Sequence, residues 1–312
     1  MTDASHPTAT MPNFLIIGAT KSGTTSIYRY LQQHPQIFLP PNVKETNFFA
    51  YENQEVAFKY WGPPPITTLN AIRDLPTYQA LFASSEARQA AAVGEVSPYY
   101  LYNQQAPQRI HYYLPHAKLV AILRHPADRA YSNYLHLIRD GREPYQNFAQ
   151  ALAAEPQRMA EGWAWDYYYR DMGYYARQLR RYYDLFTAVQ IHIFTFEAFT
   201  KQPATILQEM FRFLGIDDTF QPDTSFRDNV SGYPKNRALQ RFIDQPNIAK
   251  PLIRKLIPEK WRQKIATQLR HQNLHKPTLD PVLRAELTAD YWADIEALAT
   301  LTGQDFSIWL NS

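Results

Sequence analysis

The segment FLIIGATKSGTTSIYRYL, residues 14–31, contains the first group of residues that could bind an anion. Gly18 and Gly23 have the spacing of the G-x-x-x-x-G-K-[ST] loop of nucleoside triphosphate sites, but Thr24 follows Gly23 and the lysine, Lys21, lies inside the loop. Glycines let the backbone turn tightly and expose its N–H groups to a phosphate. The loop also offers side-chain donors, which are Lys21, Ser22, Thr24 and Thr25. The pattern therefore predicts a phosphate site without the usual ATP-binding lysine.

A second candidate anion site follows another apolar run, in AKLVAILRHPADRAYSNYLHLIR. An ATPase usually has an aspartate here that helps to hold magnesium, whereas this run ends in Arg124, which binds anions. Ser132 and His136 are four residues apart on the helix predicted next, so they share one face with each other. Each of the two, taken alone, also fits an ordinary helix residue. Two anion sites without a visible metal site indicate a nucleotide with phosphates at two places on one ribose.

The composition limits the class of protein. The chain has 312 residues, a net charge of +3 and no cysteine, which excludes disulfides, thiolate metal sites and a cysteine nucleophile. The mild basic charge favours an anionic ligand over nucleic acid. The first residues are polar, and no apolar run approaches the length of a membrane span. We therefore expect a cytoplasmic protein without a membrane anchor, with a disordered tail at 1–11 and one domain at 12–312.

The elements that must position these residues alternate along the chain. Short apolar runs predict strands at 14–17, 90–102, 117–124 and 189–197, the second ending at Ser97-Pro98. Helical spacing predicts helices from Thr24, over 126–141, 171–186 and 203–215, in a basic stretch to about 270, and from Asp280-Pro281 to Gly303. This alternation predicts an α/β fold, a single P-loop-like domain with a central parallel sheet flanked by helices.

The two anion-binding segments match a known family. IIGATKSGTTSIYRYLQQHP resembles the 5′-phosphosulfate-binding segment of sulfotransferases that use 3′-phosphoadenylyl sulfate (PAPS), and AILRHPADRAYSNYLHLIR resembles their 3′-phosphate-binding segment. VKETNFF is similar to a K-E-x-x-F-F segment of the heparan sulfate branch. GYYARQLRRYYDLF, FRFLGI and the closing WL also fit, so the resemblance extends from about residue 12 over nearly the whole chain.

The resemblance implies a role for several residues. Lys21 would stabilise charge on the leaving oxygen, and Glu45 would be the base that takes the acceptor proton. The 5′-phosphate would be held by Ser22, Gly23, Thr24 and Thr25, and the 3′-phosphate by Arg124 and Ser132. His136 would assist by contacting the acceptor or the sulfuryl oxygens. The products would be a sulfated acceptor and adenosine 3′,5′-bisphosphate (PAP), with no metal.

Further positions are expected around this centre. NVSGYPKNR resembles a loop that closes over the nucleotide, with Tyr233 against adenine and Lys235 and Arg237 toward the 3′-phosphate, although an exposed basic turn is an equal alternative. Predicted acceptor contacts are Lys44, Ser97, Tyr174 and Tyr175, while most of the aromatic run at 163–175 is expected to be core. Val96 stands where the heparan sulfate branch has a lysine, which weakens the case for a glycosaminoglycan acceptor.

Three functions remain open from the sequence. The first is transfer of sulfuryl from PAPS to a hydroxyl on a small molecule or on a hydroxyacyl chain bound to an acyl carrier protein, for which the basic helix faces would be a docking surface. The second is an ATP-dependent kinase of the P-loop class, against which Arg124 and the position of Lys21 argue. The third is a nucleotide-binding module without catalysis.

Overall fold

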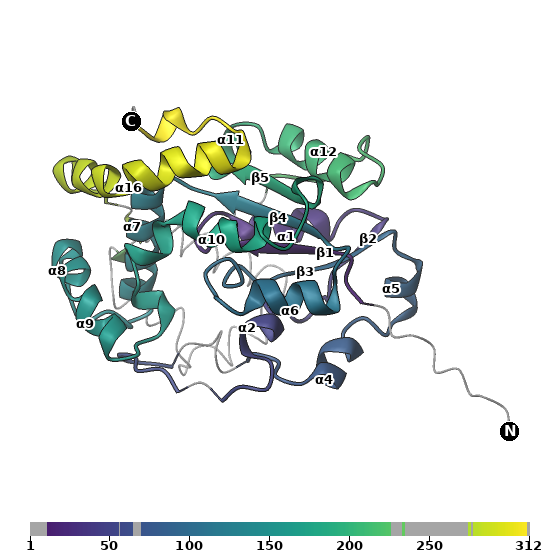
Figure 1. Ribbon diagram of the computed structural model, residues 1–312, viewed down its shortest axis with the longest axis horizontal. Helices are drawn as coiled ribbons and strands as arrows, with labels where there is room; N and C mark the ends of the chain where they lie inside the picture. Colours follow the sequence, from purple (N-terminus) through teal and green to yellow (C-terminus); the bar gives the residue numbers. More distant parts are fainter. Residues whose placement is uncertain are drawn as a thin grey trace, which may run out of the picture.

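The structure, a computed structural model, describes residues 11–55, 57–64, 70–225 and 277–310, and the backbone of 233–234 and 274–275 (Figure 1). Its centre is a sheet of five parallel strands in the order β2-β3-β1-β4-β5. The strands are β1 (Phe14–Gly18), β2 (Ile37–Phe38), β3 (Ala92–Val96), β4 (Lys118–Leu123) and β5 (Ile191–Thr195). The predicted α/β class and parallel sheet are thus confirmed.

Both faces of the sheet are buried, which explains why β1 and most of β4 are continuous apolar runs rather than alternating ones. Successive residues of β1 contribute to two separate cores: Leu15 and Ile17 to one, Phe14 and Ile16 to the other. Helices on either side supply the remaining side chains of each core, so the sheet is covered by helices on both faces (Figure 1).

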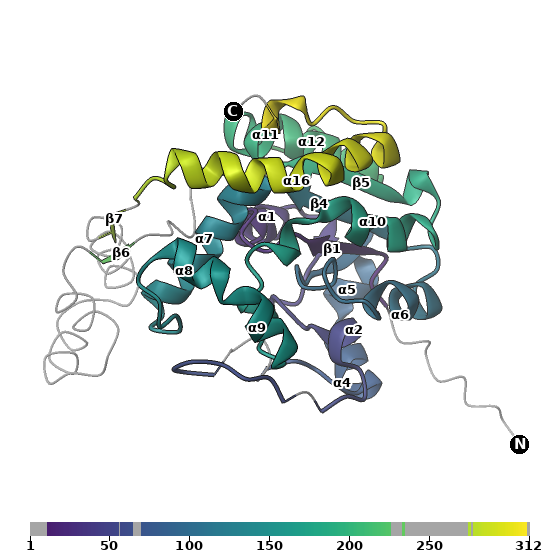
Figure 2. The same ribbon diagram turned by 60° about the vertical axis from the view of Figure 1, so that its left-hand side comes forward.

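The helices connect successive strands and end the chain. In order they are α1 (Thr24–Leu31), α2 (Phe48–Tyr51), α4 (Leu75–Ala80), α5 (Ser85–Gln89), α6 (Ala106–Tyr113), α7 (Pro126–Arg139), α8 (Phe148–Ala153), α9 (Glu155–Ala160), α10 (Tyr175–Tyr183), α11 (Phe196–Lys201), α12 (Pro203–Leu214) and α16 (Pro281–Thr302). Single 3₁₀ turns are η1 (Trp165–Tyr167), η2 (Asp171–Gly173), η3 (Ala188–Gln190) and η4 (Ser307–Trp309). Figure 2 shows α16 lying across α7 and α10.

Helix ends follow the predicted signals. Asp280 caps α16 by accepting a hydrogen bond from the Leu283 N–H at 2.9 Å, and Pro281 occupies its first turn. Gly215 and Gly303 end α12 and α16 with positive φ, where a side chain would be strained. The basic stretch that we predict as helical to about residue 270 lies outside the described residues, as does most of the tail at 1–11.

Strand β1 is the middle strand of the sheet, and the later strands are added on both of its sides. After β1 the chain adds β2 and β3 on one side and β4 and β5 on the other. In open parallel sheets, ligands bind at such a switch point, beyond the carboxyl ends of the strands. The residues that follow β1, β3 and β4 therefore meet at one edge, and they include Lys21, Ser97 and Arg124.

Candidate functional site

The loop between β1 and α1 is shaped to receive an anion. A Cβ on Gly18 would lie 2.5 Å from the Leu101 Cβ, so only glycine fits there, and Gly23 has φ +82 at the start of α1. No side chain caps α1 and its first turn has no acidic residue, which leaves its first N–H groups and its positive dipole end to a ligand. The buried Ser22 hydroxyl has no hydrogen-bond partner among the described residues. These features fit a phosphate group.

Arg124 joins this loop from the end of β4. Its Nη1 donates to the Lys21 carbonyl at 3.2 Å, and its guanidinium lies 4.8 Å from the centroid of the Phe196 ring. The Tyr175 hydroxyl donates to the Arg124 carbonyl at 2.9 Å, which fixes the backbone at the same point. The structure thus brings the two predicted anion-binding segments into direct contact. Phe196, which the sequence analysis did not single out, supports both, because it also lies beneath Gly23.

The electrostatics of Lys21 are unusual for a lysine. Burial, followed by the charges of Arg139 and Arg124, lowers the pKa of Lys21 from 10.5 to about 7, although the carboxylates of Asp140 and Glu45 act in the opposite direction. Burial is the main cause of this shift, because it disfavours the charged form of the lysine. An incoming phosphate or sulfate would bring an opposite charge and favour the protonated form.

Lys44 connects the predicted base to the phosphate loop. Its Nζ lies 2.5 Å from the Glu45 Oε1 and 3.4 Å from the hydroxyl of Thr24, the first residue of α1. Lys44 and Glu45 are both partly exposed. Lys44 therefore links the predicted base, Glu45, to Thr24 of the predicted 5′-phosphate site.

His136 lies in a cluster at the carboxyl end of α7. The Arg139 guanidinium donates to its Nδ1 at 2.6 Å, and Asp140 Oδ2 lies 3.6 Å from its Nε2. Burial and the charges of Lys21 and Arg139 lower the pKa of His136 well below its ordinary value. Because arginine only donates, Nδ1 accepts and the proton of the neutral ring lies on Nε2. His136 is thus arranged to donate a hydrogen bond rather than to take a proton.

Arg139 is a site residue that the sequence analysis missed. Its charge acts on both Lys21 and His136, and it lies three residues after His136 on α7. The same helical spacing that groups Ser132 with His136 could have identified it. Ser132 is buried one turn before His136, and Thr25 follows Thr24 in the first turn of α1.

Val96 ends β3 and Ser97 follows it, and their side chains point in different directions. The Ser97 hydroxyl is buried, donates to Glu95 Oε2 at 3.1 Å and accepts from the Asn47 N–H at 3.1 Å. This places Ser97 under the segment that carries Glu45. Val96 packs into the core on the α1 side of the sheet, with Phe14 and Ile16. The position that holds lysine in the heparan sulfate branch therefore presents no charge here.

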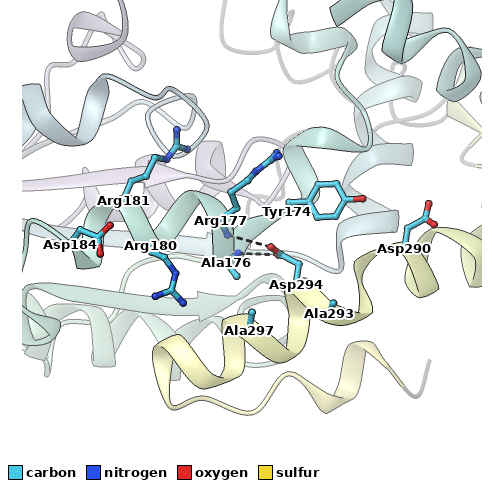
Figure 3. Close-up of a pocket in the computed structure, with 10 residues that line it drawn as sticks. All are labelled: Tyr174, Ala176, Arg177, Arg180, Arg181, Asp184, Asp290, Ala293, Asp294 and Ala297. Carbon is cyan, nitrogen blue, oxygen red and sulfur yellow. Dashed lines mark hydrogen bonds between the residues drawn. The ribbon is translucent and has the colours of Figure 1, made fainter.

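Tyr175 contacts the candidate site only through the backbone of Arg124, and Tyr174 lies in a separate groove. Tyr175 is 1% exposed, and its hydroxyl is bound to the Arg124 carbonyl, so it supports the edge from beneath. Tyr174 lies in a groove of about 610 Å³ between α10 and α16, where Asp294 accepts from the N–H groups of Ala176 and Arg177 (Figure 3). Among the predicted site residues whose side chains the structure describes, only Tyr174 lines this groove. Their roles as acceptor contacts stay predictions, which this placement does not favour.

The predicted nucleotide-closing loop is mostly beyond the described residues. Lys235 and Arg237 lie outside them, and for Tyr233 only the backbone is described, in β6 (Tyr233–Pro234), which pairs with β7 (Leu274–His275) beside α7. Within the described part of the chain, no group of three acidic or histidine side chains is arranged to hold a metal ion. None of the described helices is both long and apolar enough to cross a bilayer.

Comparison with known proteins identifies the family. A family model described as "Sulfotransferase family" matches residues 12–221. The crystal structure of a sulfotransferase from Alicyclobacillus acidocaldarius is 34% identical, with a TM-score of 0.75, and the match covers 96% of this chain and 98% of that one. The human bifunctional heparan sulfate N-deacetylase/N-sulfotransferase 3 is 29% identical over 213 residues, and its Drosophila melanogaster counterpart is 29% identical over 228 residues.

The chain belongs to the sulfotransferase family, whose members are transferases that use PAPS as sulfuryl donor and release PAP. The matches to the human and fly proteins cover 66% and 70% of this chain but only 22% and 21% of those proteins. Membership of this family also contradicts the hypothesis that the protein is an ATP-dependent kinase of the P-loop class.

Proposed function

We propose that this protein transfers the sulfuryl group of PAPS to an acceptor hydroxyl, with Glu45 as base. The observation that carries the proposal is the set of contacts around the start of α1. Arg124 contacts the Lys21 carbonyl, and Lys44 contacts both Thr24 and Glu45. The residues that we propose as donor-binding groups and as base thus lie around one uncapped helix end.

The proposed step is an in-line displacement at sulfur. The acceptor oxygen forms a bond to sulfur while the bond from sulfur to the 5′-phosphate oxygen breaks, and the acceptor proton goes to the Glu45 carboxylate. Negative charge grows on the leaving oxygen, where Lys21 and the N–H groups of α1 would stabilise it. Arg124 and Ser132 would hold the 3′-phosphate. His136, with its proton on Nε2, would donate to a sulfuryl or acceptor oxygen.

The class of acceptor is a separate part of the proposal. Lys44 beside Glu45 favours an acceptor that tolerates a nearby cation, and a small-molecule hydroxyl or a carrier-bound hydroxyacyl chain both satisfy this. An amine is the rival acceptor, because relatives that are 29% identical are named N-sulfotransferases. The same carboxylate could take a proton from nitrogen. A cytoplasmic setting remains a prediction.

The test is transfer of ³⁵S from labelled PAPS to four acceptors: 4-nitrophenol, octyl glucoside, a 3-hydroxybutyryl thioester of N-acetylcysteamine, and N-deacetylated heparosan for the amine. We expect labelled product with at least one hydroxyl acceptor. Glu45→Gln should reduce the rate by about 100-fold or more while PAP still binds. Glu55→Gln is the matched control, since Glu55 is exposed.

Three results would contradict the proposal. Labelling of the amine alone would replace the hydroxyl by a nitrogen acceptor. Binding of PAP without transfer to any of the four would support a binding module. Unchanged transfer by Glu45→Gln would remove Glu45 as the base and leave the family assignment in place.

A further inference from the structure

Glu95 is a fully buried carboxyl group that has no part in the steps above. It lies on β3 with 0% of its surface exposed. Four hydroxyl groups donate to it: those of Tyr78 at 2.8 Å and Tyr100 at 2.9 Å to Oε1, and those of Ser97 at 3.1 Å and Thr46 to Oε2. A buried carboxylate without such donors would be costly, and here each oxygen has two. Burial raises the pKa of Glu95, and the four hydroxyls act against that rise.

The same hydroxyl groups hold the backbone that follows Glu45. The Ser97 oxygen accepts from the Asn47 N–H at 3.1 Å, and the Tyr100 oxygen accepts from the Phe49 N–H at 3.3 Å. Thr46, the residue next to Glu45, accepts from the Phe48 N–H at 3.3 Å. Three consecutive amides are thus anchored to oxygens that are themselves bonded to one carboxylate.

The direction of these hydrogen bonds depends on Glu95. A hydroxyl has one proton, and by donating it to the carboxylate it leaves its lone pairs to accept from a backbone N–H. Because an ionised carboxylate only accepts, it fixes this direction for all four hydroxyls. An amide in its place would present an NH₂ group to two of them, and those hydroxyls would have to turn their protons away.

We propose that Glu95 is a positioning residue that holds Glu45 at the carboxyl edge of the sheet through the hydroxyl groups of Thr46, Ser97 and Tyr100. This inference rests on the proposed function, in which Glu45 is the base. The hydrogen bonds of the Glu95 carboxyl go to the four hydroxyls and not to Glu45 or to residues 18–25, so we expect its effect to be on the geometry of proton removal and not on donor binding.

The first measurement is the transfer rate and PAP affinity of Glu95→Gln. We expect the rate to fall by about 10- to 100-fold, the effect of a small misplacement of a catalytic group, with the PAP Kd within about threefold of the parent. In a Glu45→Gln background, Glu95→Gln should cause no further loss of rate, because it acts only through Glu45. Tyr78→Phe is the matched control, since Tyr78 bonds to Glu95 but to none of the anchored amides.

A second measurement does not depend on an acceptor. Amide hydrogen exchange at Asn47 and Phe49 should accelerate by about tenfold or more in Glu95→Gln and in Thr46→Val, and much less in Tyr78→Phe. Thr46→Val also serves if Glu95→Gln does not fold. It removes one hydroxyl from the set and keeps the side-chain volume.

The possible outcomes distinguish a failure of the positioning role of Glu95 from a failure of the proposed function. Full activity and unchanged exchange in both Glu95→Gln and Thr46→Val would overturn the positioning role, while loss of activity in Glu45→Gln would leave the proposed function standing. Loss of PAP affinity in parallel with rate would reduce Glu95 to a general stabiliser of the fold. If Glu45→Gln stays active while exchange still accelerates, the proposed base is wrong and the anchoring of the segment is right.

Discussion

Lys21 shows how a single residue can respond to the charge of its ligand. Burial and two neighbouring arginines lower the pKa of Lys21 to about 7 in the free protein. A bound nucleotide would place phosphate charge beside it and raise that pKa, because an opposite charge favours the protonated form. Nucleotide binding above pH 7 should therefore take up a proton. The affinity would be complete below pH 7 and would fall as the pH rises from 7 toward the pKa of Lys21 in the complex.

We predict that the affinity for PAP falls by up to about tenfold per pH unit from pH 7.5 upward, until the pKa of the complex is reached. Titration calorimetry in buffers of different ionisation enthalpy would measure the proton uptake. Lys21→Arg should abolish the uptake in this range, because arginine keeps its proton. An affinity that is flat from pH 7 to 9 in the parent protein would show that Lys21 stays charged without the nucleotide.

At this scale the sequence predicts residues whose type is unusual for their position. The sequence alone shows Lys21 in place of the ATP-loop lysine and Arg124 in place of an aspartate, and in the structure the Arg124 guanidinium donates to the Lys21 carbonyl. The role of Glu95 cannot be predicted from its residue type in this way. Its role depends on hydroxyls from Thr46, Tyr78 and Tyr100, and no short-range spacing connects those positions before the sheet brings them together.

Among the elements, β1 and its loop show how packing fixes the anion site. Gly18 ends β1 against the side chain of Leu101, whose N–H is bonded to the Ile17 carbonyl at 2.8 Å. The segment after β3 is thus packed onto the end of β1. Any side chain at Gly18 would push the two apart and displace the phosphate loop.

We predict that Gly18→Ala lowers the free energy of unfolding by about 1–3 kcal/mol and weakens PAP binding by at least about tenfold. Gly162→Ala is the comparison, because Gly162 has φ +72 but open space around its Cβ position. That variant should lose stability through backbone strain alone and keep its PAP affinity. Denaturant unfolding and PAP titration of both variants would decide this, and equal PAP affinities would contradict the packing argument.

The long elements were predictable and the short ones were not. The buried runs that form β1, β4 and β5 and the capped ends of α16 carry local signals. Strand β2 has two residues, Ile37 and Phe38, in a stretch that shows no periodicity and is broken by Pro40. Its position beside β3 is set by the sheet and not by its own sequence.

At the scale of the whole molecule, the last described turn packs against the residue that follows Arg124. Trp309 of η4 donates from Nε1 to Glu197 Oε2 at 3.2 Å, and its carbonyl lies 3.0 Å from His125 Nε2. Glu197, just after β5, also accepts from the His125 N–H at 3.0 Å. His125, the residue that follows Arg124, is therefore held by contacts with two distant parts of the chain, Glu197 and Trp309.

We predict that Trp309→Phe raises the PAP Kd by about three- to tenfold, because the lost hydrogen bond loosens Glu197 and with it the backbone next to Arg124. The matched control is Trp292→Phe on α16, whose side chain is 46% exposed. Isothermal titration with PAP would compare the two. Equal affinities of both variants and the parent would show that the clamp contributes to folding only.

His125, Glu197 and Trp309 are far apart in the sequence and meet in the structure. During synthesis this site can therefore be completed only after the last of the three, Trp309, has been made. Lys21, Glu45 and Arg124 leave the ribosome long before Trp309 does. A nascent chain can therefore display every charged group of the proposed centre while the segment that tightens around Arg124 is still inside the exit tunnel. We therefore expect the full affinity for PAP to be reached only after η4 has emerged.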